Sequence, residues 1–485
     1  MLAKIKELTK DTAVYGLSTI VGRFLGFLLV PYYTNVIEPD ALGIYSNIYA
    51  YLAFMNIVYL YGTDVAFMKY SAFEKGSKKT IFSTAYSSVL ITSIFLTAVL
   101  YLFKNPLIEL TKLSGGYEDI FPYVLLILFF DALAVIPFAN LRLERKTVRF
   151  ASIKTANISI NLVLNILFIS YYGMGIKGIF VANLIASLFS LIAVMPEIFR
   201  YYNFKINFDF LKKLLKFGLP YLPASMAAML VQVADRPILF ALQGKEAVGI
   251  YSANYKLGIF MMLFVSMFQY AWQPFYLNNA KEPNAKEMFA KIMTLFLVVA
   301  SLIWISLSLF IDDIVRIPIL HGRYFIGEKY WAGTFIVPMI LLAYVFNGIN
   351  VNLQAGFYIK DKTKLLPVVT FVGAGLNIVA NLILIPVYGI FGAAIATLLS
   401  YFSMAFVSFL LTRKFYPVQY ELRKIILLLI LLSVSAFGYY QYLTHLHFTM
   451  FLKILILLGF IVLILILRIV NTNDIRAVKK MFIGN

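Results

Sequence analysis

Apolar runs of about 20 residues recur along the whole chain, and each is long enough to cross a bilayer core about 30 Å thick as a helix. Of the 485 residues, 61% are hydrophobic and only 13% are charged, which is more apolar surface than one soluble core of this length could hide. The pattern predicts an all-α integral membrane protein with about 14 transmembrane helices. The helices are expected at about residues 10–34, 43–67, 80–103, 120–140, 150–170, 177–200, 214–241, 249–277, 289–310, 330–355, 365–386, 389–412, 424–443 and 450–470.

Basic residues are concentrated in alternate loops. With the N-terminus placed inside, 31 of the 42 Lys and Arg residues fall on the cytoplasmic side, including those of the loop from Arg142 to Lys154. Seven fall on the opposite side, and four lie within helices or at their edges. This asymmetry follows the positive-inside rule, so both termini are predicted to be cytoplasmic. The net charge of +19 is therefore a signal of topology and does not imply nucleic acid.

The two ends of the chain carry few further signals. The first apolar run is too long for a cleavable signal peptide and lacks a small-residue cleavage pattern, so it is expected to remain as a helix. The chain has no cysteine, which excludes disulfides, thiolate metal sites and a cysteine nucleophile.

Two pairs of similar segments indicate an internal repeat. "ALGIYSNIY" begins at Ala41 and "AVGIYSANY" at Ala247, an offset of 206 residues. "NLVLNILFISYYG" begins at Asn161 and "NIVANLILIPVYG" at Asn377, an offset of 216 residues. Each offset spans six predicted helices, and the segments occur in the same order. Chance similarity within a small apolar alphabet is the alternative interpretation.

The repeat predicts two six-helix lobes. Six is an even number, so both lobes insert with the same orientation, related by an axis along the membrane normal, and transport sites of such proteins lie between the lobes. We expect the lobes at residues 1–210 and 211–420, with two extra helices and a cytoplasmic tail in 421–485. Two asparagine pairs with a four-residue spacing are expected to bond between helices. These pairs are Asn161 with Asn165 and Asn377 with Asn381.

Three cations are predicted to lie within the membrane. Arg23 is near the middle of the first helix, while Arg236 and Lys256 are in the outer third of the seventh and eighth helices. A charge in hydrocarbon costs at least roughly 2.5 kcal/mol, so it should face a cavity or a partner. A cationic pocket between the lobes accounts for all three. Snorkelling to the headgroups is the alternative, and it applies best to Arg236 and Lys256.

Three carboxylates are also predicted at membrane depth. They are Asp64, Asp131 and Asp235. Such a group can carry a proton, ligate sodium or act as counter-ion to a nearby cation. The counter-ion role is favoured for Asp235, although adjacent helical residues point about 100° apart, so Asp235 and Arg236 need not pair.

Glycines and prolines mark places where helices approach one another or bend. Gly22 and Gly26 form a GxxxG on either side of Arg23, which permits close packing with a neighbouring helix. Pro220 and Pro223 remove backbone donors early in the seventh helix and are expected to kink it. Bends at the entrance of a lobe suit alternating access.

Enzyme motifs are absent from the sequence. The longest loop, about residues 311–329, is too short for a nucleotide-binding domain, and no P-loop or dinucleotide fingerprint is present. The histidines of "HLH" at 445–447 are expected to be solvated on an outer loop. We therefore expect no metal site, no cofactor and no ATP-driven step.

The order and spacing of these features resemble a known family. "GLSTIVGRFLGFLLVPYYTNVIEPDALGIYS", from Gly16, resembles the opening of Wzx polysaccharide flippases of the multidrug/oligosaccharidyl-lipid/polysaccharide (MOP) exporter superfamily. "VADRPILFALQGKEAVGIYSANYKLG", from Val233, resembles the start of their second lobe. The resemblance covers nearly the whole chain, including the helix count and the two lobes.

The resemblance implies a function and a location. Such proteins move undecaprenyl-pyrophosphate-linked oligosaccharide from the inner to the outer leaflet of the bacterial cytoplasmic membrane, for O-antigen, capsule or exopolysaccharide synthesis. By this resemblance Arg23, Arg236 and Lys256 are the cations that meet the pyrophosphate. Polysaccharide polymerase and chain-length machinery are candidate partners. The membrane potential, a proton or a sodium ion could drive export, since moving one charge across 100 mV is worth about 2.3 kcal/mol.

Several alternatives remain at this point. A lipid II flippase for peptidoglycan shares the architecture. A drug or metabolite antiporter of the superfamily would carry cations and so predicts an acidic cavity. A glycan polymerase would need a large outer loop with catalytic residues. A passive scaffold would leave Arg23 and Arg236 replaceable.

Overall fold

The computed structural model describes residues 20, 22–73, 77–113, 116–319, 322–442 and 449–469. Over these residues the structure is built from helices and turns, with one isolated bridge between Pro318 and Tyr324. The all-α prediction is confirmed. The chain divides into two compact units, unit 1 (Met1–Ser252) and unit 2 (Ala253–Asn485). The boundary between these compact units, after Ser252, does not test the boundary between repeats that the sequence predicts at 210/211. The repeat boundary therefore stays a prediction.

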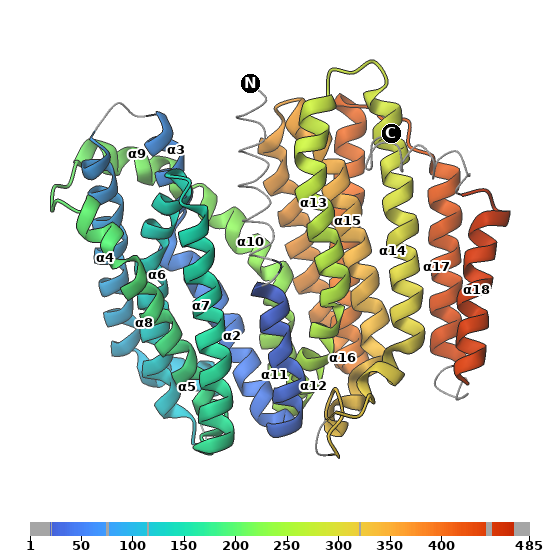
Figure 1. Cartoon of the computed structure of the whole chain (residues 1–485), viewed down its shortest axis with the longest axis horizontal. Helices are drawn as coiled ribbons and strands as arrows, with labels where there is room; N and C mark the ends of the chain where they lie inside the picture. The colour runs from blue at the N-terminus through green and yellow to red at the C-terminus, as the bar shows by residue number, and fades with distance from the viewer. Residues whose placement is uncertain are drawn as a thin grey trace. The chain divides into compact units, whose positions relative to one another are not determined.

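The first unit begins with a helix over residues 22–36. It continues with α2 (Pro39–Leu60), α3 (Thr63–Phe73), α4 (Lys78–Leu102), α5 (Lys104–Leu110), α6 (Phe121–Leu143), α7 (Thr147–Ile166), α8 (Gly175–Tyr201), α9 (Phe208–Gly218), α10 (Tyr221–Val233), α11 (Asp235–Gln243) and most of α12 (Lys245–Tyr255). Within it, α6, α7 and α8 pack against one another (Figure 1).

The second unit follows the end of α12. Its helices are α13 (Ile259–Asn279), α14 (Ala285–Val315), α15 (Val337–Ile359), α16 (Leu366–Phe415), α17 (Leu422–Tyr442) and α18 (Met450–Ile466), with 3-10 turns at Lys256–Gly258, Glu328–Ile336 and Thr363–Leu365. Within this unit α15 packs against both α13 and α16, and α14 packs against α17.

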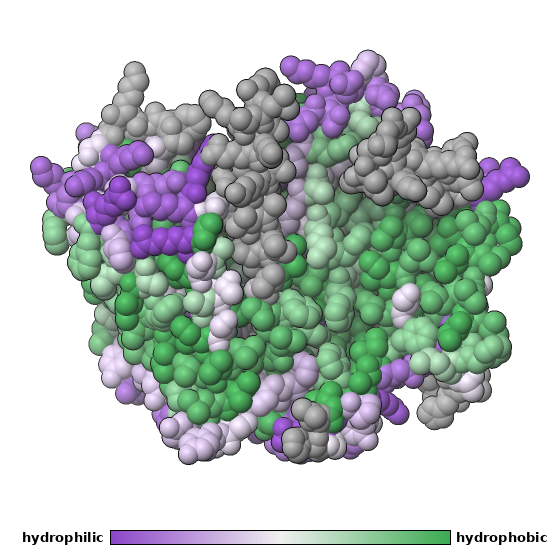
Figure 2. All heavy atoms as spheres, in the orientation of Figure 1, coloured by the Kyte–Doolittle hydropathy of each residue, from purple (hydrophilic) through white to green (hydrophobic). Residues whose placement is uncertain are grey.

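The helices have the lengths and apolarity of membrane spans. Ten helices of the described residues qualify, or eleven when α9 and α10 are counted as one bent span. In each unit, hydrophobic residues cover the middle of the helices and hydrophilic residues gather at their ends (Figure 2). The chain is therefore a multi-span membrane protein.

α16 contains two of the predicted helices. At 1.5 Å per residue a straight helix of 50 residues would be about 75 Å long, more than twice a bilayer core. Gly389 breaks it with φ 55° and ψ −132°. Ser400 Oγ donates to the main-chain oxygen of Gly373 at 2.8 Å, although 27 residues separate them. The two halves therefore fold back side by side.

The prediction of fourteen helices is not confirmed by this count. The predicted run 10–34 lies partly outside the described residues, and α18 has only 17 residues. The "HLH" segment at 445–447 also lies outside them.

Two predicted helices of the first unit are broken. The run 43–67 divides into α2 and α3 at Tyr61 and Gly62, which have positive φ angles of 37° and 75°. A Cβ on Gly62 would lie 2.5 Å from the main-chain oxygen of Gly218, so the break is also a point of close backbone packing. Only glycine fits there without displacing the α9 backbone.

A bend lies where Pro220 and Pro223 predict one. α9 ends at Gly218, α10 begins at Tyr221, and their axes differ by 40°. Pro220 occupies the position before the first residue of α10, and Pro223 lies in its first turn. Neither proline can donate to the preceding turn, so the chain changes direction at little cost in hydrogen bonds.

The two "GIYS" segments contact each other at their glycines. Gly43 is in the first turns of α2, and Gly249 is in the equivalent part of α12. A Cβ on Gly43 would lie 1.8 Å from the main-chain oxygen of Lys245, and a Cβ on Gly249 would lie 1.9 Å from that of Pro39. The contact is reciprocal, as expected when two repeated segments cross at the same position.

Candidate functional site

Asp235 and Arg236 are adjacent residues of the seventh predicted helix and form an ion pair. α10 ends at Val233 and α11 begins at Asp235, with a turn at Ala234 between them. Arg236 Nη1 donates to Asp235 Oδ1 at 2.7 Å and to the main-chain oxygen of Gln232 at 2.6 Å. In a regular helix the two side chains would point about 100° apart. Arg236 nevertheless reaches Asp235 while it also bonds to Gln232 one helical turn earlier, a pairing that the sequence did not require.

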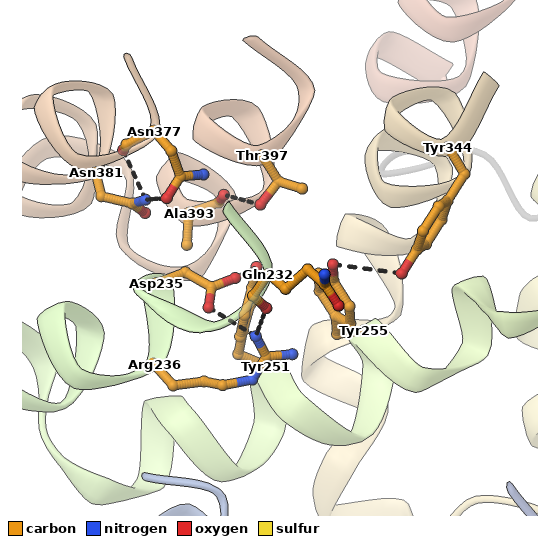
Figure 3. A network of polar contacts seen from close by, with 10 residues as sticks. All are labelled: Gln232, Asp235, Arg236, Tyr251, Tyr255, Tyr344, Asn377, Asn381, Ala393 and Thr397. Carbon is orange, nitrogen blue, oxygen red and sulfur yellow. Dashed lines mark hydrogen bonds and ion pairs between the residues drawn. The ribbon is translucent and has the colours of Figure 1, made fainter. Parts of the chain in front are cut away.

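Tyr251 completes this group. Its hydroxyl donates to Asp235 Oδ2 at 2.6 Å, and the guanidinium carbon of Arg236 lies 5.8 Å from the centre of its ring (Figure 3). The side chain of Asp235 is 2% exposed and that of Arg236 is 13% exposed. A buried ion pair of this kind is stable only when hydrogen bonds satisfy its remaining atoms. Gln232 and Tyr251 supply those bonds.

The other two predicted cations lie in different parts of the chain. Arg23 is in the helix over residues 22–36 of unit 1, and its side chain is exposed. Lys256 begins a 3-10 turn between α12 and α13, in unit 2. Arg23 and Arg236 thus share a unit and Lys256 does not, so the common pocket stays a prediction.

The predicted GxxxG packing occurs at one of its two glycines. A Cβ on Gly22 would lie 2.9 Å from Ile158 Cδ1 of α7, whereas a Cβ on Gly26 would meet no atom within 4 Å among the described residues. The expectation of close packing at Gly26 is therefore wrong. Of the two glycines, Gly22 alone marks a close approach of the first helix to α7, at Ile158.

The carboxylates Asp64 and Asp131 have different surroundings. Asp64 lies in the first turn of α3, directly after the break at Gly62, where a negative charge stabilises the helix dipole. Asp131 lies in α6 and interacts electrostatically with Lys154 of α7. Asp131 is therefore a candidate counter-ion within unit 1.

Lys154 was not among the predicted site residues. The sequence predicted a helix at about 150–170 but counted Lys154 among the basic residues of the cytoplasmic loop. α6 ends at Leu143 and α7 begins at Thr147, so Lys154 lies within the helix and not in the loop. The signal that could have found it is its spacing of three, seven and eleven residues from three asparagines of the same helix, which places all four on one face.

The connection between α6 and α7 is tied to α8 by charged side chains. The carboxylate of Glu197, 1% exposed, accepts from Lys146 Nζ at 3.0 Å, Arg149 Nη1 at 2.8 Å and Asn140 Nδ2 at 3.3 Å. Burial raises the pKa of the neighbouring Glu144, but hydrogen bonds from Lys146 and Tyr201 outweigh it and hold that pKa below its usual value. These bonds hold the connection between α6 and α7 against α8.

The asparagine pairs adopt the same geometry in both units. Asn165 Nδ2 donates to the main-chain oxygen and to Oδ1 of Asn161, at 2.7 and 2.9 Å. Asn381 Nδ2 makes the same two bonds to Asn377, at 2.8 and 3.0 Å (Figure 3). The prediction of bonding between helices is wrong for these amide donors, because residues four apart are neighbours on one helix.

The two pairs differ in one acceptor. Tyr33 donates its hydroxyl to Asn165 Oδ1 at 2.8 Å, so the predicted bond between helices is confirmed at this acceptor, which joins the first helix to α7. In unit 2, Asn381 Oδ1 is buried without a hydrogen-bond partner among the described residues. The repeat therefore conserves the helical geometry and not the environment of the pair.

Comparison with known proteins identifies the family. The family model described as "Polysaccharide biosynthesis protein" matches residues 8–278, which is more than half of the chain. "Lsg locus putative protein 1" of Haemophilus influenzae is 21% identical over 361 residues, covering 70% of this chain and 84% of the relative.

Solved structures show the fold. "Lipid II flippase MurJ, inward closed conformation" superposes with a TM-score of 0.74 at 18% identity, covering 94% of this chain and 98% of that one. An inward-facing "multidrug resistance MATE family transporter of the MOP superfamily" superposes with a TM-score of 0.65 at 14% identity, covering 81% and 94%. At these identities the likeness shows the fold alone, which is the fold of MurJ and of MATE family transporters.

Proposed function

Because the chain belongs to the polysaccharide biosynthesis protein family, we propose that it moves a lipid-linked oligosaccharide from the inner to the outer leaflet of the bacterial cytoplasmic membrane by alternating access. The single observation that carries this proposal is the family match over residues 8–278. The transporter fold supports it, since family and structural neighbours are transporters and not enzymes. The proposed cargo is undecaprenyl-pyrophosphate-linked glycan for a surface polysaccharide.

The charged residues are consistent with an anionic cargo. Asp235 already pairs with Arg236, and Asp131 already interacts with Lys154. A carrier of cationic drugs would instead need a carboxylate available to its cargo. We therefore favour glycan export over drug antiport, and we assign Arg23, Arg236 and Lys256 to the pyrophosphate.

The membrane potential can drive this export. Two negative charges leaving a negative interior gain about 4.6 kcal/mol at 100 mV, twice the value for one charge. Asp131 and Asp235 act in this proposal as counter-ions, which leaves Asp64 as the candidate for a coupled proton or sodium ion. A collapse of the potential should then slow export even when ion gradients are held constant.

The test separates the glycan cargo from lipid II. The purified chain is reconstituted in proteoliposomes with either a fluorescent undecaprenyl-pyrophosphate-linked oligosaccharide or fluorescent lipid II, and the fraction reaching the opposite leaflet is measured by quenching. We expect movement of the oligosaccharide and little movement of lipid II. Movement of lipid II alone would assign the chain to peptidoglycan synthesis, and movement of neither would overturn the proposal.

A further inference from the structure

One face of α7 is polar along most of its length. Lys154, Asn157, Asn161 and Asn165 are separated by three and four residues, the spacing that places side chains on the same face of a helix. Asn157 Nδ2 donates to Ser190 Oγ at 2.8 Å and to a main-chain oxygen of α8 at 2.6 Å. This face therefore contacts protein, and lipid would leave its amides without partners.

Lys154 lies inside the membrane span. It is seven residues after Thr147, the first residue of α7, which places it about 10 Å along the helix. Its side chain is exposed in the structure, and Nζ lies 4.2 Å from the centre of the Phe138 ring of α6. A lysine at this depth is expected to have an anionic partner or to serve a ligand.

Three residues of α6 face Lys154. Asp131, Phe138 and Arg142 are seven and four residues apart, so they share one face of α6. Lys154 over the Phe138 ring therefore lies between the carboxylate and the guanidinium, and it interacts electrostatically with both. Arg142 Nε is buried without a hydrogen-bond partner in the described part of the chain.

Arg23 approaches the same region from the first helix. Gly22, its neighbour in the chain, packs against Ile158 Cδ1, and Ile158 is one helical turn beyond Lys154 on α7. Arg23 and Lys154 thus lie at similar levels of α7, and both side chains are exposed. All of these residues belong to unit 1, so the arrangement does not depend on how the two units are placed.

The charges of this group match a diphosphate. Three cations, Arg23, Arg142 and Lys154, and one carboxylate, Asp131, leave an excess of two positive charges. A diphosphate diester has two negative charges at neutral pH. Charge-assisted bonds from Lys and Arg to phosphate are about twice as strong as neutral hydrogen bonds.

We propose that Lys154 and Arg142 of unit 1, together with Arg23, form a binding site for the diphosphate of the lipid carrier, in which Asp131 is the counter-ion of Lys154 when the site is empty. The inference rests on the proposed function. It adds α6 and α7 to the elements that contact the cargo. Asp131 competes with the diphosphate for Lys154. This competition weakens binding of the lipid carrier enough for the carrier to be released.

The test measures binding with a probe that has no glycan. The full chain in lipid nanodiscs is titrated with undecaprenyl diphosphate, and uncharged undecaprenol is the control for the contribution of the prenyl chain. Losing a charged hydrogen bond should weaken binding of the diphosphate by roughly 10- to 100-fold in Lys154→Ala and in Arg142→Gln. Binding of undecaprenol should not change. Lys212→Ala, an exposed cation of α9, is the matched control and should bind like the wild type.

Asp131→Asn distinguishes a binding role from a structural one. Removing the competing carboxylate should tighten binding of the diphosphate several-fold, whereas disruption of a structural ion pair would weaken it. Lys154→Arg should retain most of the affinity and shows whether Lys154→Ala fails through misfolding. The inference would be overturned if Lys154→Ala bound undecaprenyl diphosphate with wild-type affinity. It would also be overturned if Asp131→Asn lost as much affinity as Lys154→Ala.

The same preparations separate this inference from the proposed function. If the wild type binds undecaprenyl diphosphate through Lys154 but moves no lipid-linked glycan in proteoliposomes, the site stands and the proposed function fails. If the wild type moves the glycan and Lys154→Ala binds and moves it equally well, the function stands and the site fails.

Discussion

Gly43 of α2 and Gly249 of α12 lie against each other at backbone distance. The amide nitrogen of Gly249 is 3.1 Å from the place where a Cβ of Gly43 would be. Beside this contact, Lys245 Nζ pairs with Asp40 Oδ2 at 3.0 Å. Both glycines come from the repeated "GIYS" segments, so the repeat that identified two lobes in the sequence also forms a contact in the structure.

An alanine at either glycine should open this crossing. Gly43→Ala and Gly249→Ala each place a Cβ within 2 Å of a main-chain oxygen, so α2 and α12 must move apart. The chain lacks cysteine, so Ser46→Cys, at a buried position of α2, is a clean reporter. We expect its labelling by a membrane-impermeant maleimide to rise several-fold and export of glycan to fall.

Gly375→Ala is the matched control for this experiment. Gly375 lies within α16 and has no atom within 4 Å of its added Cβ in the described structure. Helical glycines with free space tolerate alanine, so labelling and export should stay at wild-type levels. Equal labelling in all three alanine variants would contradict a tight crossing at Gly43 and Gly249.

The two members of the Asp235–Arg236 pair should respond differently to removal. Asp235→Ala leaves a guanidinium that cannot lose its charge, and breaking a buried pair in this way costs about 3–5 kcal/mol. Arg236→Ala leaves a carboxylate that can take up a proton and still bond to Tyr251. We expect Asp235→Ala to lower the melting temperature in detergent more than Arg236→Ala does. Equal losses would show that the charge of Arg236 is compensated elsewhere.

Arg23→Ala and Arg236→Ala should abolish export of surface glycan while leaving membrane insertion intact. Both remove a cation assigned to the pyrophosphate, and neither removes a span. Surface glycan and the amount of protein in the membrane fraction are measured in cells that depend on the plasmid-borne gene. Arg23→Lys retains the charge and should retain part of the export. Normal surface glycan in both alanine variants would rule out these two cations as cargo ligands.

Glu197→Ala should destabilise unit 1 without a direct effect on cargo binding. It removes the acceptor shared by Lys146, Arg149 and Asn140, and bonds to a charged group contribute about 1.5–3 kcal/mol. The side chains of Lys146 and Arg149 are 28% and 38% exposed and can turn to water. The loss of unfolding free energy should therefore lie near the lower end of this range. Thermal unfolding in detergent measures it. Lys291→Ala, which removes an exposed pair with Glu287, is the control and should change little.

Sequence alone determined the class of this protein and predicted two lobes. Runs of about 20 apolar residues require membrane helices because an unpaired backbone group is too costly in hydrocarbon. The repeats at Ala41 and Ala247, and at Asn161 and Asn377, indicated a duplicated architecture, which agrees with the transporter fold. These properties depend on composition and order, which can be read without knowing any contact.

Only the tertiary structure decided which charged side chains meet. Asp235 pairs with Arg236 although adjacent helical residues point about 100° apart, because the Arg236 side chain reaches both Asp235 and Gln232. Lys154 was counted with the basic residues of a cytoplasmic loop, but it lies on a polar face of α7 and interacts electrostatically with Asp131 of α6. The partner of a charge in a membrane helix depends on how side chains and helices pack, so spacing along the sequence does not identify it.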